Sequence, residues 1–176
     1  MIPIFANVGV PMFFPQIVLM AFAFIPVVFI EALFVRKFIR VTFPDALAGT
    51  AIANAWTTLL GVPIAWLLMF IFELVNPIGG KALGVDSPIR MLIAVTLQAA
   101  WLIPYEEDLR WMIPAAATFL LLPCFAISVF IERWILVRRW PDKNRKVLFS
   151  TVLRANLWSY LSLFVGGCVW TSKNFK

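Results

Sequence analysis

The sequence contains no histidine and only two cysteines, Cys124 and Cys168. Without histidine, the chain lacks the commonest haem and metal ligand and the base of histidine-dependent catalytic triads. The cysteines form no metal-binding motif and fall at different depths of different predicted helices, so we expect small buried side chains and no disulfide. The sequence also contains no CxxC, HExxH, P-loop or GxGxxG motif. We therefore expect a protein that is not an enzyme, and no cofactor is indicated.

Charged residues are also scarce, at 14% of the chain, where a soluble domain has about a quarter. Hydrophobic residues make up 62%, and the mean hydropathy is +0.93. Long apolar runs with few charges predict a membrane protein. The net charge of +6 would suggest a nucleic-acid partner in a soluble protein. Here the basic residues lie between apolar runs, so we interpret them as orientation signals and expect no nucleic acid.

The first sixteen residues contain no lysine or arginine, so the sequence predicts no cleavable signal peptide. Pro3, Gly9, Pro11 and Pro15 interrupt this stretch. Because proline is tolerated mainly in the first turn of a helix, we expect an interfacial lead-in before the first regular helix begins near residues 12–15.

One stretch of sequence occurs twice. A Val-Phe-Ile-Glu run at 28–31 is followed by a basic turn and then by Asn54, and the same run at 129–132 is followed by a basic turn and Asn156. The spacing from the Val-Arg pair of each turn to its Ala-Asn pair is identical in the two copies. We interpret each copy as a membrane hairpin of two apolar helices joined by a basic turn.

The predicted fold is all-α, a single transmembrane domain over residues 1–176 with four spans in two tandem parallel-repeat hairpins. The first repeat covers about 12–73 and the second about 110–171. The outer segment between them, about 77–109, contains an apolar run at 91–104 that is too short to span comfortably, so we expect a short interfacial helix. Small residues in the second helix predict close helix packing: Ala48, Gly49, Ala51, Ala53 and Ala55.

Basic residues predict the orientation. The turns that follow the first and third spans, counted over 36–40 and 133–154, hold ten of the fifteen Lys and Arg. By the positive-inside rule we expect both turns in the cytoplasm and both termini outside, in the plasma (inner) membrane. Tryptophans near the helix ends fit an interfacial belt: Trp111 and Trp170 at the outer ends, Trp134 and Trp140 at the inner end.

Four polar residues inside the predicted spans are the main site candidates: Glu31, Asn54, Glu132 and Asn156. Each repeat places its Glu and Asn at a similar depth, so the four can form one polar layer, and each Glu is expected beside the Asn of its own copy. An ionisable group within a span tends to face the protein interior and marks a functional site. Two interpretations remain open. The layer is a structural clamp, in which Glu31 can also pair with Arg36, Lys37 or Arg138, or it handles a proton or cation.

The basic turns supply candidate lipid head-group contacts at Arg36, Lys37, Arg138 and Arg139. Simple retention of positive charge in the cytoplasm explains them equally well.

For function, the sequence favours a non-enzymatic integral membrane subunit or accessory scaffold protein of a larger membrane complex. Its expected partners are membrane lipids and other integral membrane subunits. The alternative is a small transporter or channel that uses the Glu/Asn layer. A membrane-embedded enzyme ranks third, because no nucleophile–base pair is visible.

Overall fold

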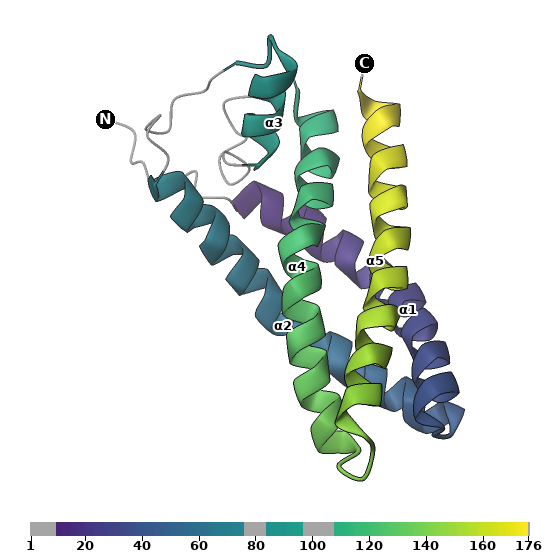
Figure 1. Ribbon diagram of the computed structural model, residues 1–176. Helices are drawn as coiled ribbons and strands as arrows, with labels where there is room; N and C mark the ends of the chain where they lie inside the picture. The colour runs from purple at the N-terminus through teal and green to yellow at the C-terminus, as the bar shows by residue number, and fades with distance from the viewer. Residues whose placement is uncertain (1–9, 76–83, 97–107, 176) are drawn as a thin grey trace.

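The computed structural model describes residues 10–75, 84–96 and 108–175, and this part of the chain is helical with no strand. Its five helices are α1 (Val10–Ile39), α2 (Phe43–Val75), α3 (Pro88–Thr96), α4 (Leu109–Arg139) and α5 (Arg145–Asn174) (Figure 1). The all-α prediction is confirmed. The helices α1 and α2 together cover 10–75, α4 and α5 together cover 109–174, and the short helix α3 lies between the two pairs in sequence. Residues 77–83 and 97–107 of the expected interfacial segment, and residues 1–9 of the expected lead-in, lie outside the described residues.

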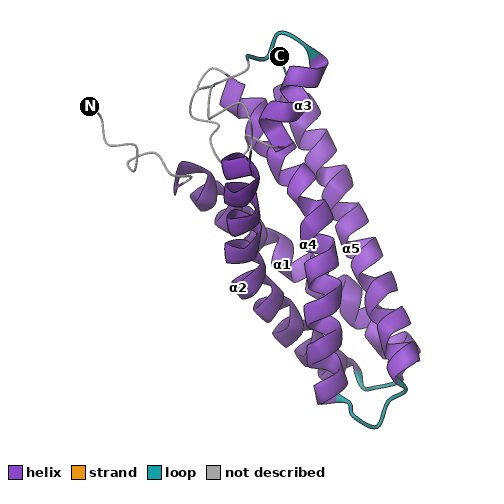
Figure 2. Ribbon diagram, turned by 60° about the vertical axis from the view of Figure 1, so that its left-hand side comes forward, coloured by secondary structure: helices purple, strands orange, loops and turns teal. Residues whose placement is uncertain are grey.

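The four long helices pack side by side. α1 contacts α2 and α5, α4 contacts α2 and α5, and α3 packs against α4. In Figures 1 and 2, the α1–α2 turn and the α4–α5 turn lie at one end of the molecule, and α3 and the C-terminus lie at the other. Both basic turns are therefore at the same end of the helix bundle.

Two of the long helices, α4 and α5, are long and apolar enough to cross a membrane. They contain 31 and 30 residues, which at a rise of about 1.5 Å per residue exceeds the roughly 30 Å hydrocarbon thickness of a bilayer. By contrast, α3 has 9 residues and is only about 14 Å long by the same rise, so it cannot span by itself.

Polar residues face inward and large apolar residues face outward over much of the bundle. The buried residues include nine that are polar or charged, contributed by α1, α2, α4 and α5. Large apolar side chains on the same helices are exposed, such as Phe22 at 77% and Phe130 at 68%. A water-soluble protein normally buries most such side chains and exposes its charged ones. The bundle has the opposite distribution at these positions.

The turns at the basic end have recognisable helix-end signals. Asn144 caps α5, because its side-chain oxygen accepts from the backbone N–H groups of Lys146 and Val147 at 2.9 and 3.4 Å. Arg40 ends α1 in the left-handed region, with φ 59°, a conformation that glycine more often supplies. Thr42 accepts from the Asp45 backbone N–H at 3.4 Å at the start of α2. Short turns of this kind keep consecutive helices antiparallel.

Close packing by small residues is confined to part of the predicted set. Gly49 and Ala53 are buried, Ala51 is partly buried, and Ala48 and Ala55 are exposed. Gly49 lies directly against the Trp140 ring at the end of α4, where an added Cβ would come within 2.7 Å of the ring edge. The predicted set was therefore too broad, because only one stripe of α2 faces its neighbouring helices.

The tryptophans also divide into two groups. Trp134 and Trp170 are exposed, as expected of an interfacial belt. Trp111 and Trp140 are buried and donate from their indole nitrogens to Asp108 at 2.9 Å and Asp45 at 2.8 Å. These two differ from the expectation, because protein carboxylates satisfy their N–H groups.

Substitution of Gly49 with alanine tests the α2–α4 contact. The added methyl group must displace the Trp140 ring, so we expect G49A to lower the free energy of unfolding by about 1–3 kcal/mol. The control is G166A in α5, where an added Cβ meets no atom within 4 Å. That change should be neutral or stabilise by up to about 1 kcal/mol, because alanine is the better helix former. Thermal unfolding of the purified variants in detergent measures both, and equal midpoints for the two would contradict the packing argument.

Candidate functional site

Glu31 and Asn54 join α1 to α2 inside the bundle. Asn54 Nδ2 donates to Glu31 Oε2 at 2.5 Å, and the same amide also donates to the Thr50 carbonyl oxygen of its own helix at 3.0 Å. Glu31 is 1% exposed. A buried carboxyl group is costly unless it is hydrogen-bonded, so this contact constrains how α1 and α2 pack.

Glu132 and Asn156 repeat this arrangement between α4 and α5. Asn156 Nδ2 donates to Glu132 Oε2 at 2.6 Å and to the Val152 carbonyl oxygen at 3.2 Å. Glu132 is 2% exposed and Asn156 is fully buried. Each Glu thus bonds to the Asn of its own sequence copy, which is the pairing that the repeat suggested. The role of these residues as a site stays a prediction.

The two pairs meet in the interior. Ser159 of α5 donates from its hydroxyl to Glu31 Oε1 at 2.8 Å, which links the second copy to the first. Ser159 also donates to the Asn156 carbonyl oxygen, and Asn156 donates to Glu132, so the hydrogen-bonded chain from Glu31 reaches Glu132. All four long helices therefore contribute to one connected polar cluster, which we call the polar layer: Glu31, Asn54, Glu132, Asn156 and Ser159.

Ser159 was not among the predicted site residues. Its only sequence signal is its position three residues after Asn156, where the first copy has Thr57 three residues after Asn54. The two hydroxyls differ in the structure. Thr57 donates to the Asn54 carbonyl oxygen of its own helix at 2.9 Å, whereas Ser159 bonds both to the Asn156 carbonyl oxygen and across to Glu31. The layer is therefore not symmetric.

Two acceptor oxygens in the layer lack a donor. Within the described residues, no hydrogen-bond donor reaches Glu132 Oε1 or Asn156 Oδ1, although both atoms are buried. Buried polar atoms in folded proteins are nearly always hydrogen-bonded, so each exception needs a physical reason. The Ser159 hydroxyl of the second copy donates to Glu31 Oε1 of the first. If the first copy mirrored this, the Thr57 hydroxyl would donate to Glu132 Oε1.

The structure excludes the version of the structural clamp in which Glu31 pairs with a basic residue of the turns. In the described part of the chain, the ion pairs are Arg90–Asp86, Arg139–Asp45 and Lys143–Asp142. Glu31 therefore pairs with none of the basic residues that the sequence offered, Arg36, Lys37 or Arg138. The physical reason is its inward orientation, toward Asn54 and Ser159 and away from the turns.

The basic residues proposed as head-group contacts lie at the turn end of the bundle. Arg36 and Lys37 lie over the rings of Phe43 and Phe38, at 5.9 and 5.4 Å from the ring centroids. Arg138 stacks on Trp134 at 3.6 Å. All three cations are exposed. Their contact with lipid stays a prediction.

Arg139 differs from the other three because it has a protein partner. Its guanidinium donates to Asp45 Oδ1 at 2.6 Å, and Trp140 donates to Asp45 Oδ2 at 2.8 Å. Asp45 is in the first turn of α2, outside the apolar part of that helix. The Trp140 hydrogen bond, followed by the Arg139 hydrogen bond, holds the pKa of Asp45 below its usual value. This contact fastens the start of α2 to the end of α4.

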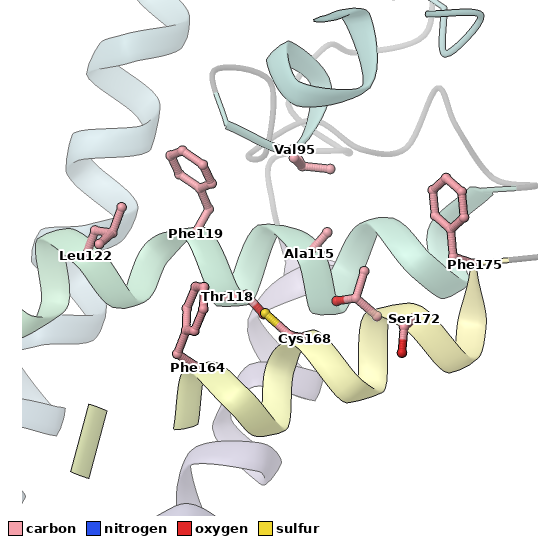
Figure 3. Close-up of a pocket in the computed structure, with 10 residues that line it drawn as sticks. Val95, Ala115, Thr118, Phe119, Leu122, Phe164, Cys168, Ser172 and Phe175 are labelled. Carbon is pink, nitrogen blue, oxygen red and sulfur yellow. The ribbon is translucent and has the colours of Figure 1, made fainter. Parts of the chain in front are cut away.

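A separate apolar pocket lies at the opposite end of the bundle. It has a volume of about 580 Å³ and lies among α3, α4 and α5, with Phe119, Phe164 and Phe175 on its walls (Figure 3). Its remaining lining residues are small, aliphatic or weakly polar: Val95, Ala115, Thr118, Leu122, Cys168, Thr171 and Ser172. Its described lining includes no charged side chain. The pocket suits an apolar chain better than a polar ligand.

Neither a metal site nor a comparison with known proteins assigns a role to the polar layer. Among the described residues, no group of three or more His, Cys, Asp and Glu side chains is placed to hold a metal ion. No protein-family description matches the chain, and comparisons with curated proteins and with solved structures found no match. The polar layer is therefore interpreted from its own geometry.

Replacement of Ser159 with alanine tests the link between the two copies. S159A leaves Glu31 Oε1 without its donor, so we expect a loss of about 1–3 kcal/mol in the free energy of unfolding. The matched control is S162A, one turn further along α5, whose hydroxyl donates only to the Ser159 carbonyl oxygen of the same helix at 2.6 Å. S162A should change stability little. Denaturant titration of both variants in detergent gives the comparison, and similar losses for the two would argue against a link through Ser159.

Proposed function

We propose that the chain is a four-span integral membrane protein of the plasma (inner) membrane, built as two tandem parallel-repeat hairpins, α1–α2 and α4–α5. We propose further that it is a non-enzymatic subunit or accessory protein of a larger membrane complex. The observation that carries this proposal is the exposed apolar surface on every long helix, illustrated by Phe22, Leu59, Phe130 and Trp158. Lipid tails or the apolar faces of other subunits are the surroundings in which such a surface is stable.

The sequence of the first two helices supports their assignment as spans. Within Val10–Ile39 the charged residues are Glu31, Arg36 and Lys37, and the last two are at the turn end. Within Phe43–Val75 the charged residues are Asp45 and Glu73, close to the two ends. An apolar stretch longer than the roughly 20 residues needed to span separates them in α2.

Orientation follows from the basic turns. Because both turns lie at the same end of the bundle, one membrane face receives the cluster of lysine and arginine from both copies. The positive-inside rule assigns that face to the cytoplasm. Both termini are then outside.

The large size of the exposed apolar side chains supports a subunit role. The outward faces of α1, α2, α4 and α5 carry many phenylalanine, tryptophan and leucine side chains. Large aromatic residues dominate the energetics of protein interfaces. A small bundle with such faces on all of its long helices is suited to packing beside other membrane subunits.

Photo-crosslinking from one position on each long helix tests the subunit role. In native membranes, we expect a crosslinker placed at Phe22, Leu59, Phe130 or Trp158 to capture one specific integral membrane protein. At least one of these four positions should give that product. A crosslinker at the buried Leu148 is the control and should capture nothing outside the chain. Gentle purification should then recover that protein in a fixed ratio. Crosslinks to lipid or to a second copy alone, with a lone oligomer after purification, would contradict the subunit role.

A small transporter or channel is the second candidate. It is favoured by one observation, the presence of two buried carboxyl groups in a single hydrogen-bonded cluster in the interior of the bundle. Ionisable groups that face the interior of a membrane bundle are the usual parts of proton and ion pathways.

Cysteine labelling tests the orientation. In a variant with Cys124 and Cys168 replaced by alanine, K143C places a thiol in the α4–α5 turn and K173C places one at the far end of α5. We expect a membrane-impermeant reagent added to intact cells to label K173C and to leave K143C unlabelled until the cells are opened. Labelling of K143C from outside would reverse the proposed topology.

A further inference from the structure

We propose that Glu31 and Glu132 form a proton-binding pair, which holds a single proton between their carboxyl groups in the interior of the bundle. The proton is bonded to an oxygen of one carboxyl group and accepted by an oxygen of the other. The inference rests on the polar layer alone and goes beyond the subunit role, so it stands or falls separately from any partner protein.

The first support is a count of hydrogen-bond donors. The two carboxyl groups have four oxygens, and three of these accept hydrogen bonds from Asn54, Ser159 and Asn156. Within the described residues, the fourth oxygen, Glu132 Oε1, has no donor. A proton held by the pair supplies the missing donor without any change in the helices. Asn156 Oδ1 also lacks a donor, so the layer as a whole has more acceptors than donors.

The second support is electrostatic. Glu31 and Glu132 belong to one buried hydrogen-bonded cluster, where two ionised carboxylates would repel each other strongly, and such pairs commonly share one proton. A buried charge also needs a partner, yet no ion pair among the described residues includes either carboxyl group. A single bound proton removes one of the two charges and replaces the repulsion with a hydrogen bond.

The other described titratable and charged side chains near the pair have partners of their own, so we assign the proton to the two carboxyl groups. Tyr160 of α5 lies near the layer and is engaged with the Ser128 hydroxyl at 2.7 Å. The nearest arginines in sequence, Arg133 and Arg154, lie over the rings of Phe149 and Phe38. The described side chains of α2 bring the hydroxyl and amide groups of Thr50, Asn54 and Thr57 to this depth, and no charged group.

A proton fits the site better than a metal ion. Mg²⁺ and Ca²⁺ require six or more oxygen ligands. Here asparagine and serine already occupy three of the four carboxylate oxygens. A proton needs only two oxygens, one from each carboxyl group.

Infrared spectroscopy of the purified protein in lipid nanodiscs tests the pair. We expect wild-type protein at neutral pH to show the C=O band of one protonated carboxyl group per chain, which disappears as the pH rises. The double variant E31Q/E132Q should lack the band, and the surface variant D142N should keep it. In E31Q or E132Q alone, the remaining carboxyl group should lose its proton at a lower pH than the wild-type pair, because the neighbouring negative charge is gone.

Three results would overturn the proposal. One is the absence of a protonated carboxyl group in wild-type protein at neutral pH, which needs no variant to fold. Another is identical titration of the single variants and the wild type, which would mean that the two groups do not interact. The third is displacement of the proton by one of NaCl, KCl or CaCl₂ and not by the others at equal ionic strength, which would make the layer a metal-ion site.

Discussion

The fold depends on hydrogen bonds among polar side chains that are buried away from water. Glu31 and Glu132 are buried among apolar helices, and each must find its donors within the protein because an unpaired buried carboxyl group costs several kcal/mol. Asn54, Asn156 and Ser159 supply them. Since these donors come from different helices, satisfying the carboxyl groups fixes the depth and the rotation of all four long helices together.

The turn end of the bundle adds a second constraint of another kind. Asp45 accepts from both Arg139 and Trp140, and Gly49 allows the Trp140 ring to lie against α2 one turn later. The Arg139–Asp45 ion pair is exposed, so solvent screens it and its own contribution is small, whereas the Trp140 ring and Gly49 are buried. Together, the contacts of Asp45 and Gly49 join the two sequence copies a second time, at the turn end of the bundle. They fix the position of α2 along α4.

Repeated sequence does not produce identical chemistry in the two copies. The Glu–Asn bond occurs in both, and in both the asparagine also donates to the carbonyl four residues earlier. The hydroxyl three residues after each asparagine behaves differently, because Ser159 reaches across to Glu31 while Thr57 stays with its own helix. With Thr57 bonded to its own helix, Glu132 Oε1 has no donor among the described residues, so the two carboxyl groups have different surroundings.

The sequence by itself determined the helices, the basic turns and the pairing of each Glu with the Asn of its copy. Apolar runs, prolines and charges act locally, and a repeated spacing predicts a repeated contact. It did not determine that the two carboxyl groups join one cluster, nor the Ser159 bond, the burial of Trp140 or which small residues of α2 face the bundle interior. Those depend on how far each helix is rotated against its neighbours, and that rotation is set only when residues more than a hundred positions apart, such as Glu31 and Ser159, meet in the folded bundle.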